Sequence, residues 1–80
     1  MDDIEDVNLD CRGMKCPRPI IELARARRNA SPGTVISIIA DDLAFESDVK
    51  AWCQTTGNKM IDFNKEENTV KASIEICDVK

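Results

Sequence analysis

The sequence of 80 residues is 42% hydrophobic and 32% charged, and its formal net charge is −4 at pH 7. The length leaves room for one small core, and the apolar fraction excludes an intrinsically disordered chain. No apolar run approaches the roughly 18 residues that a membrane-spanning helix needs, and the acidic first residues lack the apolar region of a secretory signal. We therefore expect residues 1–80 to form one domain in the cytoplasm, without membrane association and with reduced thiols.

The first half of the chain predicts a strand, a helix and a second strand. Residues 7–11 alternate between apolar and polar side chains, as in a half-buried strand. Residues 17–30 predict a helix that ends at the Ser-Pro-Gly sequence 31–33. Residues 34–41 are rich in β-branched side chains and almost continuously apolar, so they predict the most buried strand.

The second half predicts a helix followed by two strands. Apolar residues recur at helical spacing over 45–56, and Gly57 follows at the position where glycine commonly ends a helix. Residues 59–63 predict a strand, 65–68 a turn, and 69–77 an alternating strand.

The predicted order of elements is therefore β-α-β-α-β-β. The β-α-β crossover makes the first two strands parallel, whereas the last two form an antiparallel hairpin, which gives a mixed four-stranded sheet. Since the last strand alternates, one face of the sheet should be covered by both helices, in an α/β (α+β) two-layer sandwich. We expect Asp41 and Asp42, which follow the second strand, to cap the second helix.

The chain contains four cysteines and no histidine. Cys11, Cys16, Cys53 and Cys77 include no CxxC pair, so we expect no zinc or other metal site and no cofactor. The missing histidine also excludes a cysteine–histidine nucleophile pair within one chain. Any reactive thiol must be activated by charged side chains and the backbone.

Cys16 directly precedes the predicted first helix. We place Pro17 at the first helical position, where its fixed φ angle suits the helix and its missing N–H is not needed. Proline also keeps the preceding residue extended, so Cys16 is predicted as the N-cap, and Pro19 falls within the first turn. The partial positive charge of a helix N-terminus should lower the thiol pKa below its ordinary value of about 8.5.

Basic residues are concentrated around this cysteine. Between residues 12 and 28 there are six basic residues and one acidic residue, and Arg12, Lys15 and Arg18 lie closest to Cys16. This pattern favours a reactive thiol, because nearby cations stabilise the thiolate. The alternative, that Cys16 is a structural residue and the arginines form a solvated helix face, stays open at this point.

Residues 9–19, LDCRGMKCPRP, resemble the Leu-Asp-x-x-Gly-x-x-Cys-Pro-x-Pro signature of the TusA (SirA-like) sulfur-carrier family. The matching positions are Leu9, Asp10, Gly13, Cys16, Pro17 and Pro19. The segments PGTVISIIADD, at 32–42, and WCQTTGN, at 52–58, resemble two further parts of the family pattern. The resemblance covers nearly the whole chain and implies a β-α-β-α-β-β two-layer fold, in agreement with the order predicted above.

The resemblance also implies a function. A single TusA-like domain over residues 1–80 would be a sulfurtransferase that carries sulfane sulfur as a persulfide on Cys16. A sulfur-donor protein, such as a cysteine desulfurase or a rhodanese-like protein, would load it, and an acceptor protein would receive the sulfur. Family members serve tRNA thiolation, molybdenum-cofactor supply or sulfur oxidation. We expect a monomer that acts as a stoichiometric relay.

The residues flanking Cys16 have expected roles of their own. Arg12, Lys15 and Arg18 are candidates for steering acidic partner surfaces, or they are ordinary surface charges. Asp10 is expected to organise the loop through backbone N–H groups. Gly13 is expected to supply a turn with positive φ rather than chemistry.

The remaining cysteines define an alternative function. A thiol redox or sensing module would use Cys16 with Cys11 as a resolving thiol, although Cys11 is predicted to be buried. Cys53 lies on the apolar helix face, where core packing is favoured. Cys77 shares the parity of the polar residues of the last strand, so we expect it to be exposed and without a role.

Nucleic-acid binding by the basic helix face is a third alternative. The chain is acidic overall, and it contains one Trp, two Phe and no Tyr. Because interleaved basic and aromatic residues are missing, we expect no direct contact with nucleic acid.

Overall fold

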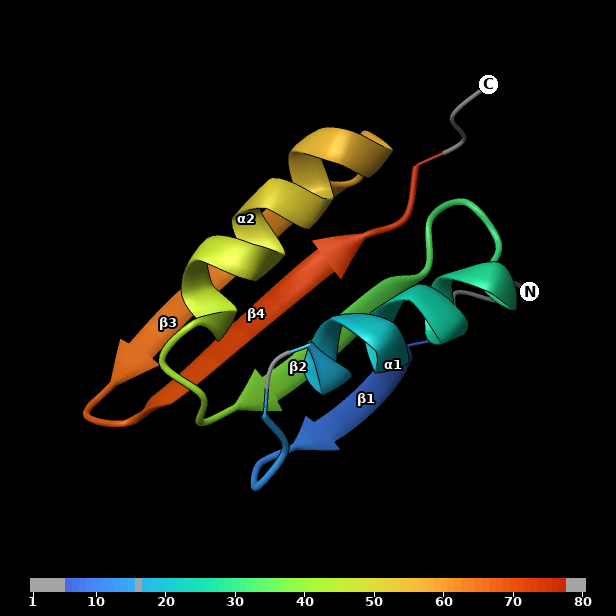
Figure 1. Ribbon diagram of the computed structural model, residues 1–80. Coiled ribbons are helices and arrows are strands. Elements are labelled where there is room, and N and C mark those ends of the chain that lie inside the picture. Colours follow the sequence, from blue (N-terminus) through green and yellow to red (C-terminus); the bar gives the residue numbers. More distant parts are fainter. Residues whose placement is uncertain (1–5, 16, 78–80) are drawn as a thin grey trace.

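The computed structural model describes residues 6–15 and 17–77. Its elements are β1 (Asp6–Cys11), α1 (Arg18–Arg28), β2 (Val35–Ala40), α2 (Phe45–Thr56), β3 (Lys59–Glu66) and β4 (Thr69–Glu75). Both helices lie on one face of a four-stranded sheet (Figure 1). The predicted β-α-β-α-β-β order and the two-layer sandwich are thereby confirmed. Among the described helices, none is long and apolar enough to cross a membrane.

The strand order across the sheet is β1-β2-β4-β3. β1 and β2 are parallel, whereas β4 is antiparallel to both of its neighbours. Since β1 and β2 run in the same direction, the segments that follow them leave from the same edge of the sheet (Figure 1). Cys11 is aligned with Ala40, so Arg12 and Asp41 begin these segments as neighbours. This register positions the candidate site.

The core lies between the sheet and the two helices. Along β2 and β4 every second residue is buried, as expected for strands with one covered face. Leu23 of α1 and Val49 of α2 close the core from the helix side, each with 0% of its surface exposed. The buried hydrophobic residues are Cys11, Leu23, Ile36, Ile38, Ala40, Phe45, Val49, Cys53, Val70, Ala72, Ile74 and Ile76.

Helix α1 begins one residue later than predicted. Pro17 is the N-cap and Arg18 the first helical residue, so the prediction that Cys16 is the N-cap is wrong. The N–H of Ile21 donates to the Pro17 carbonyl oxygen at 3.0 Å, which is the helical hydrogen bond that an N-cap residue accepts. Pro19 lies in the first turn as expected, and its side chain is buried, which fixes the start of the helix to the core.

Helix α2 spans the predicted residues 45–56, but its N-cap is not the predicted one. Gly57 is the C-cap with φ 79°, and its N–H donates to the Cys53 carbonyl oxygen at 2.9 Å. The N-cap is Ala44, which makes no side-chain capping hydrogen bond, so neither Asp41 nor Asp42 is the N-cap residue of this helix. The N–H of Phe45, the first helical residue, donates to the backbone carbonyl oxygen of Asp42 at 3.0 Å. The acids precede the N-cap by two and three residues, and Asp41 bonds elsewhere.

The C-terminal hairpin is tighter than predicted. β3 continues through Glu66, which is aligned with Thr69, and the predicted turn 65–68 shrinks to two residues. Glu67 has a φ of 46° there, the left-handed conformation that a tight reversal demands. Pairing across the hairpin accounts for the difference, because it extends the strand into a polar sequence that has no strand signal of its own.

Strand β2 lies inside the sheet, and its buried side chains should contribute strongly to the stability of the fold. Ile38 has no exposed surface, so Ile38→Ala should lower the free energy of unfolding by about 2–5 kcal/mol. The matched control is Ile61→Ala on edge strand β3, where 47% of the side chain is exposed, and its effect should stay below about 1 kcal/mol. Urea unfolding followed by circular dichroism measures both, and equal effects would contradict the assignment of the core.

Candidate functional site

Cys16 itself lies outside the described residues, but its neighbours define the setting. Lys15, Pro17 and Arg18 are all exposed. The N–H of Arg18 donates to the Lys15 carbonyl oxygen at 2.8 Å, which ties together the residues on either side of Cys16. The segment that carries Cys16 therefore joins the end of β1 to the start of α1 along an exposed surface.

The start of α1 offers fewer backbone donors than the sequence suggested. Pro17 and Pro19 have no N–H, and the N–H of Arg18 is already bonded to Lys15. A direct set of backbone hydrogen bonds to a sulfur anion is therefore unavailable from these three residues. The helix dipole and the cationic side chains of Lys15 and Arg18 are the remaining sources of positive potential.

Asp10 and Arg12 form a bidentate ion pair beside this segment. Asp10 Oδ1 accepts from Arg12 Nε at 2.9 Å, and Oδ2 accepts from Nη2 at 2.8 Å. Oδ1 also accepts the Arg12 backbone N–H at 3.2 Å, as expected for an acid that orders a turn. The side-chain hydrogen bonds from Arg12, followed by the backbone one, lower the pKa of Asp10 to about 2.

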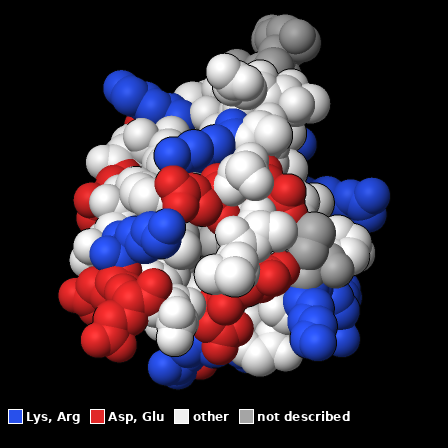
Figure 2. Space-filling model, turned by 60° about the vertical axis from the view of Figure 1, so that its left-hand side comes forward, with Lys and Arg blue, Asp and Glu red and all other residues white. Residues whose placement is uncertain are grey.

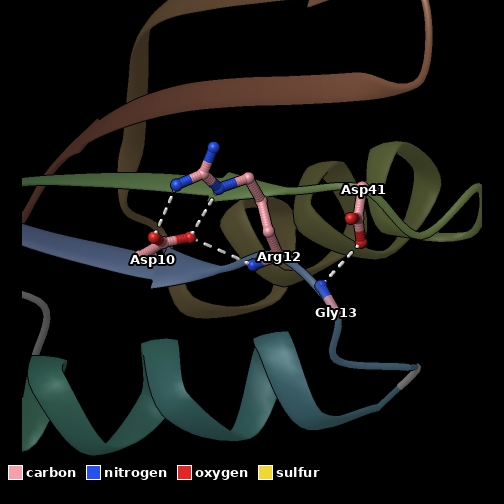
Figure 3. Close-up of polar contacts among 4 residues, drawn as sticks. All are labelled: Asp10, Arg12, Gly13 and Asp41. Carbon is pink, nitrogen blue, oxygen red and sulfur yellow. Dashed lines mark hydrogen bonds and ion pairs between the residues drawn. The ribbon is translucent and has the colours of Figure 1, made fainter.

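This pairing changes the picture of the basic cluster. Figure 3 shows the Asp10–Arg12 pair on the side of the β1 and β2 ribbons that faces away from α1. The guanidinium is bound by a carboxylate, so much of its charge is compensated locally. Of the three predicted steering residues, Lys15 and Arg18 are therefore better placed than Arg12 to present net positive charge near Cys16.

Gly13 supplies the turn that the sequence predicted. Its φ is 86°, and the N–H of Met14 donates to the Cys11 carbonyl oxygen at 3.2 Å across the turn. A positive φ at the third residue is typical of a type II turn, which favours glycine there. The turn directs the Gly13 N–H toward Asp41, whose Oδ1 accepts it at 2.9 Å (Figure 3).

Sequence reasoning missed this contact, because it assigned Asp41 to the second helix. The predicted parallel pairing of the first two strands could have indicated it, because the residues that follow two parallel strands lie at the same edge of the sheet. The register of Cys11 with Ala40 was the additional information needed.

Two hollows lie around the segment. One of about 340 Å³ is lined by Gly13, Met14, Lys15, Asp41 and Asp42. A more apolar groove of about 360 Å³ is lined by Pro17, Ile20, Asp48, Ala51, Trp52 and Thr55. Pro17, the residue after Cys16, therefore borders a hollow with apolar surface.

The other cysteines are poorly suited to chemistry. Cys11 is 1% exposed and Cys53 is 8% exposed, which confirms the predicted burial of both. Burial raises the pKa of each thiol, and Glu22 raises that of Cys11 further. Since the thiolate is the nucleophile, a buried thiol of raised pKa is a poor resolving group.

Cys77 is half-buried rather than exposed as its parity in the strand suggested. Its N–H donates to Asn58 Oδ1 at 2.9 Å, and its Sγ donates to the Glu75 carbonyl oxygen at 3.6 Å. The buried Asn58 side chain holds this end of the chain against the molecule, which alternation along the strand could not reveal. Across residues 6–15 and 17–77, no group of three or more Cys, Asp and Glu side chains could hold a metal ion.

Charges of both signs are mixed on the surface. Figure 2 shows acidic side chains across the centre and lower left of one face, with basic side chains between them and at the right-hand edge. This face carries no continuous basic patch among the described residues. The described part of this face therefore lacks the basic stripe that is typical of nucleic-acid-binding surfaces.

The fold and the exposed segment after β1 define a class of small two-layer α+β proteins. The model of the family "Sulfurtransferase TusA" matches residues 7–76. The crystal structure of a SirA-like protein from Desulfitobacterium hafniense has a TM-score of 0.77 and covers 90% of this chain and 99% of that one. At 18% identity, this likeness shows the fold alone.

Two curated relatives are each named "Putative sulfur carrier protein". The one from Archaeoglobus fulgidus is 36% identical over 62 residues, which cover 78% of this chain and 80% of that protein. The one from Aquifex aeolicus is 32% identical over 71 residues, which cover 89% of this chain but only 36% of that protein. The chain belongs to the TusA (SirA-like) family of sulfur carriers.

The burial of Cys11 and Cys53 predicts low thiol reactivity. In a Cys16→Ser/Cys77→Ser variant, both remaining thiols should react with Ellman's reagent at least about tenfold more slowly in the native protein than in urea. Adding Cys11→Ala to this variant separates the two contributions. Native rates equal to the unfolded rates would contradict the observed burial.

The Asp10–Arg12 pair predicts a defined dependence of stability on pH. Because the pKa of Asp10 is lowered to about 2, its contribution is present above the unfolded value of 3.8 and is lost as the pH falls toward 2. The destabilisation caused by Asp10→Asn should therefore shrink between about pH 5 and about pH 2, as measured by urea unfolding. In an Arg12→Gln background, the effect of Asp10→Asn should depend much less on pH. An unchanged dependence on pH would contradict the pairing of Asp10 with Arg12.

Proposed function

We propose that this protein carries sulfane sulfur as a persulfide on Cys16. The proposal rests on a difference in exposure between the cysteines of this protein. Cys11 and Cys53 are buried, whereas the residues on both sides of Cys16 are exposed. Sulfur carriage requires a thiol that a partner protein can reach, and the described neighbours of Cys16, Lys15 and Pro17, are both exposed.

The transfer conserves atoms and electrons. The Cys16 thiolate attacks the outer sulfur of a donor persulfide, and the donor cysteine leaves as a thiolate when its S–S bond breaks. The new persulfide on Cys16 then offers its outer sulfur to the thiolate of an acceptor protein in the same way. No external oxidant is needed, so the protein acts as a stoichiometric relay between two partners.

Partner recognition follows from the surface beside Cys16. Lys15 and Arg18 are exposed and would attract an acidic partner surface, increasing the rate of encounter. The groove lined by Pro17, Trp52 and their neighbours offers apolar area for the contact itself. A cysteine desulfurase or rhodanese-like donor and a thiol-bearing acceptor protein fit these requirements.

The redox alternative is less well supported. A resolving thiol must approach Cys16 as a thiolate, but Cys11 packs in the core and burial raises its pKa. Forming a disulfide would therefore require Cys11 to leave the core at the end of β1. Sulfur relay needs no second cysteine.

Intact-mass spectrometry tests the proposal. After incubation with a cysteine desulfurase and cysteine, or with a rhodanese-like protein and thiosulfate, the reduced protein should gain the mass of one sulfur atom, and a reductant should remove it. Cys16→Ser should gain none, whereas the matched control Cys77→Ser should gain sulfur like the wild type. Sulfur on Cys16→Ser, or none on the wild type with either donor, would contradict the assignment.

A further inference from the structure

The segment between β1 and α1 is held by hydrogen bonds of two kinds. Most are local, since Arg12 bonds to Asp10 and Met14 bonds to Cys11. The bond from the Gly13 N–H to Asp41 Oδ1 is different, because it joins residues 28 positions apart. It connects the segment to the end of the neighbouring strand β2.

The conformation of Gly13 makes this contact possible. Its φ of 86° lies in the left-handed region, where a residue with a side chain is strained. A Cβ atom placed on Gly13 would meet nothing within 4 Å, so the requirement for glycine is conformational rather than steric. Figure 3 shows the Gly13 nitrogen and the Asp41 carboxylate facing each other across the ends of β1 and β2.

The backbone at Asp41 is held in place by strand β2. It follows Ala40, which has no exposed surface and is aligned with Cys11. A carboxylate accepts a stronger hydrogen bond from a backbone N–H than a neutral oxygen does. Asp41 is itself exposed, so the bond serves chiefly to select one arrangement of the segment rather than to hold the domain together.

We propose that Asp41 is a positioning residue for sulfur transfer. Through the Gly13 N–H, it holds the segment that leads to Cys16 in the arrangement that a partner's persulfide requires. Attack on a sulfur atom needs aligned reacting groups, and misplacement by about 1 Å can slow such a step by about a hundredfold. The inference rests on the proposed role of Cys16 and assigns to Asp41 a part in the same reaction.

Two substitutions at Asp41 separate position from charge. Asp41→Ala removes the acceptor, and sulfur loading at saturating donor should slow by about tenfold. Asp41→Asn keeps an acceptor oxygen and should stay within about threefold of the wild-type rate. The donor concentration for half-maximal loading should change little in either variant, because Asp41 acts on alignment rather than affinity. Asp62→Ala on exposed strand β3 makes the same change in charge and should load normally.

Alkylation of Cys16 by iodoacetamide provides a readout that needs no partner. Its rate and its pH profile should be nearly the same in Asp41→Ala and the wild type, because a small reagent does not require an aligned segment. Amide hydrogen exchange at Gly13 should become faster in Asp41→Ala, which reports the lost bond directly. Gly13→Ala should also slow loading, and combining it with Asp41→Ala should add less than the two separate effects predict.

The outcomes are distinct. Wild-type loading rates in Asp41→Ala, or a slow Asp41→Asn, would overturn the positioning role and leave the carrier function intact. An equal loss of alkylation and loading would also overturn it, because the effect would then be on the thiol itself. A wild-type protein that accepts no sulfur from any donor would overturn both proposals.

Discussion

The parallel pairing of β1 with β2 is the constraint on which the site depends. It aligns Cys11 with Ala40, two residues whose side chains are almost fully buried. The register is therefore set by core packing, since a slip of one residue would move the apolar side chains to the open face. Both strands end at the same edge of the sheet, so the segments that follow them are neighbours. Gly13, in the segment that leads to Cys16, therefore bonds to Asp41.

The segment is fixed from both sides of the sheet. On the open face, Asp10 binds Arg12 and orders the first residues after β1. On the covered face, the buried ring of Pro19 secures the start of α1 to the core. Between these two anchors the chain remains exposed at Lys15 and Pro17. A rigid base beneath an accessible segment would suit the proposed function, in which the sulfur must reach different partners without unfolding.

Electrostatics near the site are more balanced than the sequence count implied. The basic cluster stands out in a chain with a net charge of −4, but Asp10 binds one of its members directly. The effective positive potential is therefore carried by fewer side chains, of which Lys15 and Arg18 flank Cys16. Under the proposed function, donor and acceptor proteins would share this small surface, which would favour transient contacts over a permanent complex.

The sequence by itself determined the order of elements, the burial of Cys11 and Cys53, and the turn at Gly13. These features follow from local periodicity and from the conformational demands of single residues. It also indicated the family, because the signature around Cys16 is compact and continuous in the chain.

Only the tertiary structure decided the rest. The contact of Asp41 with Gly13 joins distant residues, and it depends on strand register, which periodicity does not define. The start of α1 at Arg18 depends on which carbonyl accepts the first helical hydrogen bond. The half-burial of Cys77 follows from the side chain of Asn58, which belongs to another part of the chain. Local signals could not reveal the contacts of Asp41 and Asn58, because each forms where separate segments meet and one satisfies a backbone group of the other.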